Sequence, residues 1–183
     1  MRCALSDVLP SNRRGLAPLL VASYDIETYG SRGAGVLPDA HIGEDFICAI
    51  TTNFWRIGTA DSESFNVVMI VGGESSVNHG ENTAVESYAS EESLLIAWSE
   101  CIRRSGASVV TGYNIYRFDN AYVATRAHML GIPIFWYMGA YLCEPAEAKP
   151  FKLESAAFGQ NEGVTFDLKG RVVLDMMQYI MQN

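Results

Sequence analysis

The sequence of 183 residues lacks the features that would mark a metal-stapled, secreted or membrane protein. Its four cysteines are scattered, with no C-x-x-C pair, which argues against a zinc site or a disulfide framework and favours a reducing, intracellular compartment. No stretch reaches the roughly 18 apolar residues of a transmembrane helix. Acidic, proline and arginine residues interrupt the segment where a signal peptide would lie. A membrane partner is therefore not expected.

An excess of positive charge is also absent. The chain has 13 Lys and Arg against 21 Asp and Glu, for a net charge of −8, whereas free-standing nucleic-acid-binding domains are usually basic. This balance argues against a domain that holds duplex by electrostatics alone. It is compatible with an enzyme that carries cations in its active site, or with one domain of a larger and more basic protein. The length and a hydrophobic content of 49% are enough for one buried core.

The first half of the chain is typical of a β-meander. Three segments rich in β-forming residues are separated by short gaps, which favours antiparallel pairing. They lie at 16–28, 46–55 and 65–71. Residues 1–15 are expected to be a polar lead-in to a domain that we place at 16–183, and residues 72–89 are expected to be irregular.

The hydrophobic period then changes to that of helices. Ser90 is a predicted N-cap and Gly106 a predicted end of the first helix, and a second helix is expected from Phe118 to Gly131. A short fourth strand at 108–114 lies between them. We therefore expect an α/β fold with a mixed sheet, in which a parallel strand joins the antiparallel meander and helices flank it.

The C-terminal part shows weaker patterns. Residues 134–163 match no clear period. Residues 165–168 and 171–174 are predicted to form a hairpin around the Lys-Gly pair at 169–170, and 175–181 begins another apolar-periodic segment.

Two acids, Asp25 and Glu27, lie at the end of the first predicted strand. Alternate strand residues share a face, so the two carboxylates point the same way, with Cα atoms about 7 Å apart, while Ile26 points into the other face. Carboxylates this close repel each other, and a divalent cation such as Mg²⁺ bound between them is the usual remedy. The alternative is a solvated strand end without a ligand.

A third acid, Asp119, follows the fourth strand in the pattern Asn114-x-x-x-Phe118-Asp119. An acid in a first helical turn is also typical of a residue that caps the helix or favours its dipole. If the first and fourth strands are neighbours, however, Asp119 approaches Asp25 and Glu27 at the carboxyl edge of the sheet. Three converging carboxylates are what two-metal phosphoryl transfer requires.

These acids lie in segments that resemble a known pair of motifs. The first and second exonuclease motifs of family B DNA polymerases are similar to Tyr24-Asp25-Ile26-Glu27-Thr28 and Thr111-Gly112-Tyr113-Asn114-Ile115-Tyr116-Arg117-Phe118-Asp119. The segment 170–176 resembles the strand that follows them in delta-type and viral members, so that the resemblance covers residues 18–182. It implies a ribonuclease H-like fold and proofreading 3′→5′ exonuclease chemistry of the DEDD type.

The resemblance also implies roles for individual residues. Asp25 would be shared by two Mg²⁺ or Mn²⁺ ions, Glu27 would hold the ion on the side of the attacking water, and Asp119 would serve the other ion. The residues implied to contact the last nucleotides of a single-stranded DNA 3′ end are Asn114, Phe118 and, more weakly, Thr28 and Tyr113. The polymerase domains of the same longer chain would be partners, in a nucleus or at a viral replication site.

One part of the family pattern is missing. The fourth carboxylate of the family comes from a Tyr-x-x-x-Asp motif, which does not occur after Asp119. The only later aspartates are Asp167 and Asp175, and Asp175 matches a family position that is not a metal ligand, so we interpret it as structural. We therefore expect a piece of a longer protein, truncated before the third motif and weak or inactive alone. No Asp-Thr-Asp palm signature is present, so nucleotide addition is not expected from these residues.

Two other functions stay open at this point. The chain could be a non-catalytic ribonuclease H-like module that binds nucleic acid or protein, although intact acids at positions 25, 27 and 119 argue against a decayed site. It could also be an RNA-directed exonuclease of the same fold. The Thr-Gly-Tyr-Asn lead into the second motif favours the polymerase.

Overall fold

The computed structural model of the protein describes residues 6, 15, 18–58, 60, 63–73, 80–133, 135–141, 145–155 and 159–181. Within these residues the strands are β1 (Leu20–Thr28), β2 (Ile47–Arg56), β3 (Phe65–Val71), β4 (Thr83–Tyr88), β5 (Val109–Gly112), β6 (Glu147–Ser155), β7 (Gly159–Asp167) and β8 (Val172–Asp175). The helices are α1 (Glu91–Ser105), α2 (Asp119–Met129), α3 (Phe135–Met138) and α4 (Met176–Ile180). The predicted lead-in at 1–15 lies almost wholly outside the described residues.

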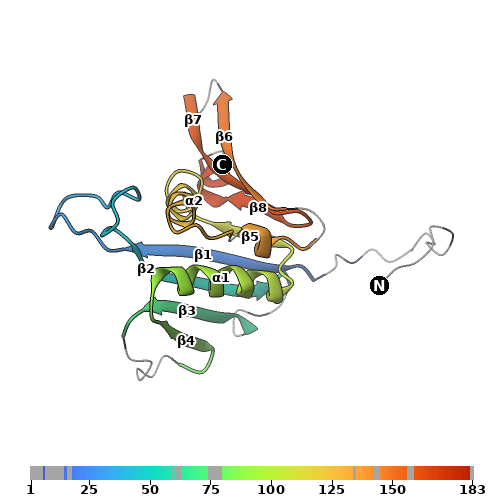
Figure 1. Cartoon of the computed structure of the whole chain (residues 1–183). Coiled ribbons are helices and arrows are strands. Elements are labelled where there is room, and N and C mark those ends of the chain that lie inside the picture. The colour runs from blue at the N-terminus through green and yellow to red at the C-terminus, as the bar shows by residue number, and fades with distance from the viewer. Residues whose placement is uncertain are drawn as a thin grey trace.

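The main sheet has the strand order β4-β3-β2-β1-β5-β8 (Figure 1). β1, β2 and β3 pair antiparallel, which confirms the predicted meander, and β5 pairs parallel with β1. The expected mixed α/β sheet is therefore present. β1 begins at Leu20 rather than at residue 16, and Pro18, which cannot donate a ladder hydrogen bond, lies just before it.

The prediction that residues 72–89 are irregular is wrong for part of this range. Residues 83–88 form β4, which pairs parallel with β3 from Asn66 opposite Thr83 to Val71 opposite Tyr88. None of the six β4 residues is fully buried, because the strand lies at the edge of the sheet. An edge strand with mixed polar and apolar residues lacks the alternation on which strand prediction depends.

The predicted hairpin over residues 165–174 is also wrong. The turn around Gly170 exists, with the Arg171 amide donating to the Leu168 carbonyl (2.9 Å), but the strands on its two sides do not pair with each other. β7 pairs antiparallel with β6, whereas β8 pairs parallel with β5, from Val172 opposite Val109 to Asp175 opposite Gly112. The chain changes sheets at this turn, because β5 offers a free edge.

Helix α1 covers one face of the main sheet (Figure 1). Its side chains Leu94, Leu95 and Trp98 are completely buried, and its predicted boundaries are confirmed. Ser90 and Ser93 form a capping box at the start of the helix. Gly106 ends it in the left-handed conformation, at φ 71°.

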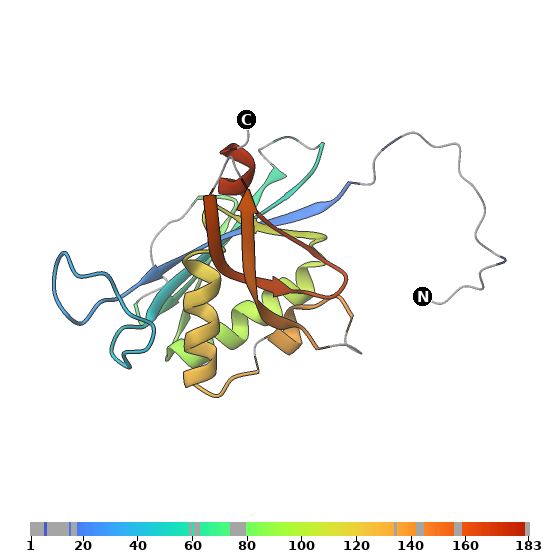
Figure 2. The ribbon, with the colours of Figure 1, turned by 90° about the horizontal axis from the view of Figure 1, so that it is seen from above.

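Helices α1 and α2 lie on the same face of the sheet (Figure 2). Tyr24 of β1 contacts both, because its ring lies 4.9 Å from the ring of Trp98 in α1 and its hydroxyl donates to Asn120 Oδ1 in α2. The side chains of β1 that alternate with Tyr24, among them Asp25 and Glu27, are thus directed to the opposite face.

Strands β6 and β7 form a two-stranded arm that projects from the main sheet (Figure 1). The arm is joined to the turn before α2, where the Val164 amide donates to the Tyr116 carbonyl (2.7 Å) and Asn120 Nδ2 donates to the Val164 carbonyl (2.9 Å). The rings of Phe151 and Tyr116 pack at 4.6 Å. The arm and α3 occupy the region that showed no clear period.

Candidate active site

The end of β1 exposes two acids on one face. Asp25 and Glu27 are exposed, whereas Ile26 between them is 5% exposed and belongs to the core. The predicted alternation is therefore present. Because these side chains lie on the face that α1 and α2 do not cover, their carboxylates are open to solvent.

Asp119 is the first residue of α2 and is 3% exposed. Its side chain does not cap the helix, since the N-cap is Phe118 and that cap has no side-chain hydrogen bond. Instead, Asp119 Oδ1 accepts a hydrogen bond of 3.1 Å from the Ile26 amide. This interaction places the third acid against the backbone of β1 between the other two.

The amide of Ile26 is available because β5 is short. β5 pairs with β1 only from Val21 to Ser23, and the chain then leaves the sheet in the turn that leads to α2. Beyond Ser23, no strand among the described residues pairs with this edge of β1. Asp119 supplies the acceptor that a longer β5 would have supplied.

The electrostatic state of Asp119 follows from its position. The pKa of Asp119 is raised from the ordinary 3.8 to about 6, chiefly by burial; the carboxylates of Asp25 and Asp175 contribute to the increase, and the hydrogen bonds from the Ile26 amide and from its own amide oppose it. A buried carboxylate without a cation partner is unfavourable at neutral pH. The site therefore favours a positive charge near Asp119.

The residues predicted to contact substrate lie mostly in the turn before Asp119. Tyr113 and Phe118 are 62% and 37% exposed, and the ring of Phe118 packs against that of Tyr122 at 5.6 Å. Asn114 is half-buried, and its φ of 62° is the only positive value of a non-glycine residue in the described chain. Thr28 lies apart from this turn, at the end of β1, next to a register shift in its pairing with β2.

The predicted convergence of three carboxylates is incomplete. Among the described residues, no three His, Cys, Asp or Glu side chains are grouped so that they could hold a metal ion. Carboxylate oxygens are the donors that Mg²⁺ and Mn²⁺ prefer, so the type of donor fits the implied ions. Asp119 is joined to β1, but the acids do not form a finished ligand set.

One residue that supports the site, Asn120, has no signal in the sequence. Asn120 is fully buried; its Oδ1 accepts from the Tyr24 hydroxyl and its Nδ2 donates to the Val164 carbonyl. It thus joins α2 to β1 and to β7 directly beside Asp119. An asparagine at the start of a helix is common, and only the tertiary contacts distinguish this one.

The sheet order, with acids at the end of β1 and after β5, defines a ribonuclease H-like domain of mixed α/β architecture. The sequence model of the family described as "DNA polymerase family B, exonuclease domain" matches residues 1–183. The chain therefore belongs to the exonuclease-domain family of family B DNA polymerases.

Individual relatives agree with this assignment. The chain is similar to the DNA polymerase delta catalytic subunit of Bos taurus (32% identity, covering 97% of the chain and 16% of that protein) and of Candida albicans (30%, 91% and 15%). It is also similar to the DNA polymerase of Paramecium bursaria Chlorella virus NY2A (27%, 95% and 19%). The chain thus spans less than a fifth of the length of these relatives. In the described residues, no helix is both long and apolar enough to cross a membrane.

Proposed function

We propose that this chain is the proofreading 3′→5′ exonuclease part of a replicative family B DNA polymerase. It would remove nucleotides from single-stranded or mispaired DNA 3′ ends, and the polymerase domains of the same longer chain would be its partners. The observation that carries the proposal is the hydrogen bond from Ile26 to Asp119, which brings the acids of two motifs to one strand end. Family membership and the delta-type and viral relatives support it.

The proposed reaction is hydrolysis of the terminal phosphodiester with two Mg²⁺ or Mn²⁺ ions. When bound, the ions would activate a water and stabilise the leaving oxygen. Asp25 and Glu27 would hold them with their exposed carboxylates, and Asp119 would do so from its buried position. Because Asp119 is held by a backbone amide, its contribution to this ligand set is fixed before substrate binds.

Binding of the DNA end is assigned to the exposed side chains around the acids. Phe118 and Tyr113 offer aromatic faces on which unpaired bases can stack. Asn114 offers a side-chain amide, and Thr28 lies at the end of β1. A single-stranded end is favoured over duplex because stacking on these rings requires unstacked bases and because the chain carries a net charge of −8.

The test is the Asp25→Ala substitution in the full-length protein. We expect hydrolysis of a 3′-labelled single-stranded oligodeoxynucleotide to fall by about a thousandfold or more, because loss of one metal ligand removes several kcal/mol of transition-state stabilisation. Primer extension should be unchanged. Asp167→Ala is the matched control, because Asp167 is paired with Lys149 and Lys169 away from β1. Retained hydrolysis in D25A would contradict the proposal that the acids of this chain carry the exonuclease reaction.

A further inference from the structure

We propose that Asp175 is a positioning residue of the exonuclease site. Its carboxylate accepts hydrogen bonds from two main-chain amides and thereby holds the turn of Asn114 in its substrate-binding conformation. The inference rests on the proposed function and names a residue that the motifs do not include. Asp175 ends β8 and lies opposite Gly112 of β5. It therefore stands at the same carboxyl edge of the sheet from which the second motif departs.

The side chain of Asp175 is almost completely committed to backbone amides. It is 5% exposed; Oδ1 accepts from the amides of Asn114 (2.8 Å) and Met177 (2.9 Å), and Oδ2 accepts from the amide of Tyr116 (3.0 Å). The bond to Met177 caps α4, as an aspartate N-cap does. The other two bonds reach across 61 and 59 residues of sequence, and helix capping does not require them.

The turn that Asp175 holds has an unfavourable backbone. Asn114 adopts φ 62°, a left-handed conformation that costs energy for a residue with a side chain and persists only where the surroundings impose it. The amides that donate hydrogen bonds to Asp175 are those of Asn114 itself and of Tyr116, two residues later. A carboxylate that accepts from both amides favours this conformation over the extended alternatives.

The consequence of the turn is the placement of groups that face the DNA end. The amides of Arg117 and Phe118 donate to the Asn114 carbonyl (3.2 and 3.3 Å), so the conformation of Asn114 sets the position of Phe118, the N-cap of α2. The side-chain Oδ1 of Asn114 is itself buried and accepts no hydrogen bond from the described residues. An acceptor in that state is suited to a donor on the substrate, such as a sugar hydroxyl.

The structure also separates this role from that of a metal ligand. Both oxygens of Asp175 already accept amide hydrogens and the residue is 5% exposed, so three backbone amides compete with any ion for this carboxylate. Asp25 and Glu27, in contrast, are exposed. Asp175 therefore acts on the substrate through Asn114 and Phe118 and does not contact the reacting atoms.

The experiment is a double-mutant cycle in the full-length protein, with a single-stranded oligodeoxynucleotide as substrate. The variants are Asp175→Asn, Asn114→Gly and their combination. Asn keeps the shape of Asp, but its NH2 group only donates. In D175N this group faces at least one of the backbone N–H groups whose hydrogen bonds Asp175 accepts. Gly adopts φ 62° without strain and keeps the backbone amide, but it removes the side chain. Asp167→Asn is the matched control.

We expect D175N to raise KM about tenfold, as for the loss of one hydrogen bond to a charged group, with a smaller change in kcat. N114G should raise KM by a similar factor. In the N114G background, D175N should change KM by less than about threefold, because the two residues act through one contact. The D167N control should keep the KM of the wild type, and the dependence on Mg²⁺ concentration should stay the same in D175N.

Other results would overturn the inference. A merely structural role would lower the active fraction, and so kcat and the melting temperature, at constant KM. An undiminished effect of D175N in the N114G background would show that it does not act through Asn114. A changed Mg²⁺ dependence would make Asp175 a metal ligand. If D175N fails to fold, N114G tests the inference by itself. An unchanged KM in N114G would then overturn the inference. If the wild type hydrolyses nothing, the proposed function falls as well, whereas an active wild type with an unaffected D175N overturns this inference alone.

Discussion

Asp119 shows how a functional acid is held in an environment that does not favour its charge. Its carboxylate is buried, accepts a hydrogen bond from the Ile26 amide, and lies near Asp25 and Asp175. Natural proteins accept such local destabilisation at functional sites, where a bound cation or substrate compensates for it. Asp119 should therefore lower the stability of the metal-free protein.

The Asp119→Asn variant tests this at the scale of one residue. With the pKa of Asp119 raised from 3.8 to about 6, the native state binds more protons than the unfolded state between these pH values, so stability falls as pH rises through this window. We expect D119N to be more stable than the wild type by about 2 kcal/mol at pH 7 and equally stable near pH 4, in urea unfolding with a chelator present. If D119N changed the free energy of unfolding by the same amount at both pH values, this would contradict the burial of an ionised carboxylate at pH 7.

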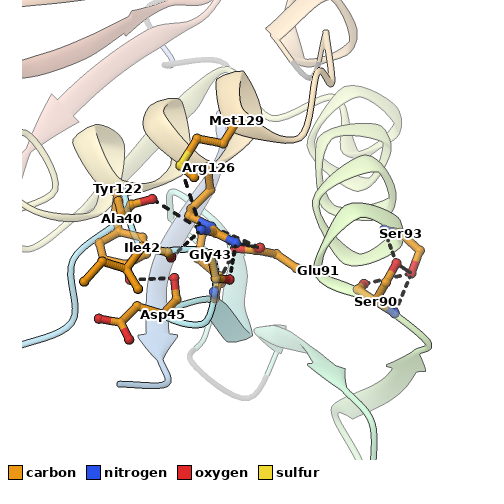
Figure 3. Close-up of polar contacts among 11 residues, drawn as sticks. Ala40, Ile42, Gly43, Asp45, Ser90, Glu91, Ser93, Tyr122, Arg126 and Met129 are labelled. Atoms are coloured by element: carbon orange, nitrogen blue, oxygen red, sulfur yellow. Dashed lines mark hydrogen bonds and ion pairs between the residues drawn. The ribbon is translucent and has the colours of Figure 1, made fainter. Parts of the chain in front are cut away.

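The loop between β1 and β2 follows directly after the first motif, and a buried ion pair organises it. Arg126 of α2 donates to Glu91 of α1 through Nε and Nη2, the latter at 2.6 Å, and both side chains are almost fully buried (Figure 3). Arg126 Nη1 also donates to the Ile42 carbonyl at 2.9 Å, and Glu91 Oε1 accepts from the Ile47 amide at 2.8 Å. Two helices and the loop are thus joined at one point.

The Glu91→Ala variant tests this connection at the scale of elements. It leaves the Arg126 guanidinium buried without its carboxylate, so we expect a loss of about 3 kcal/mol in the free energy of unfolding, measured in urea. Glu92→Ala is the matched control, because Glu92 lies in the same first turn of α1 but is exposed, and its loss should change stability by less than about 0.5 kcal/mol. Similar losses in both variants would show that the helix dipole, and not the ion pair, matters.

At the scale of the whole molecule, the β6–β7 arm is held to the main body beside the substrate turn. Gly163 allows this contact, since a Cβ at that position would lie 2.1 Å from the carbonyl oxygen of Tyr116. The next residue makes the hydrogen bond from the Val164 amide to the same carbonyl. The backbone of the arm therefore approaches the turn more closely than any side chain would permit.

The Gly163→Ala variant should separate the arm from the body. The added methyl group must displace backbone, so we expect faster hydrogen exchange at the Val164 amide and earlier proteolytic cleavage of the arm, with a stability loss of about 2 kcal/mol. Gly43→Ala is the control, because a Cβ at residue 43 meets nothing within 4 Å. Unchanged exchange at Val164 in G163A would show that the arm accommodates the methyl group without moving.

Much of the architecture follows from local patterns in the sequence. The meander of β1 to β3, the capped helix α1 and the exposure of Asp25 and Glu27 on one face arise from periodicities of two and 3.6 residues and from capping residues, which act over a few positions. The pair of motifs was sufficient to indicate the family, which the comparison with known sequences confirmed.

The tertiary structure alone decided how distant segments meet. β4 and β8 pair with strands that the local pattern does not name, and the arm occupies residues without a clear period. The same holds at the site, where Asp119 accepts from Ile26 and Asp175 accepts from Asn114 and Tyr116 across long separations in sequence. A strand edge or a backbone amide can form hydrogen bonds with any partner of the right geometry. Which segments pair therefore depends on which groups the completed fold leaves unpaired.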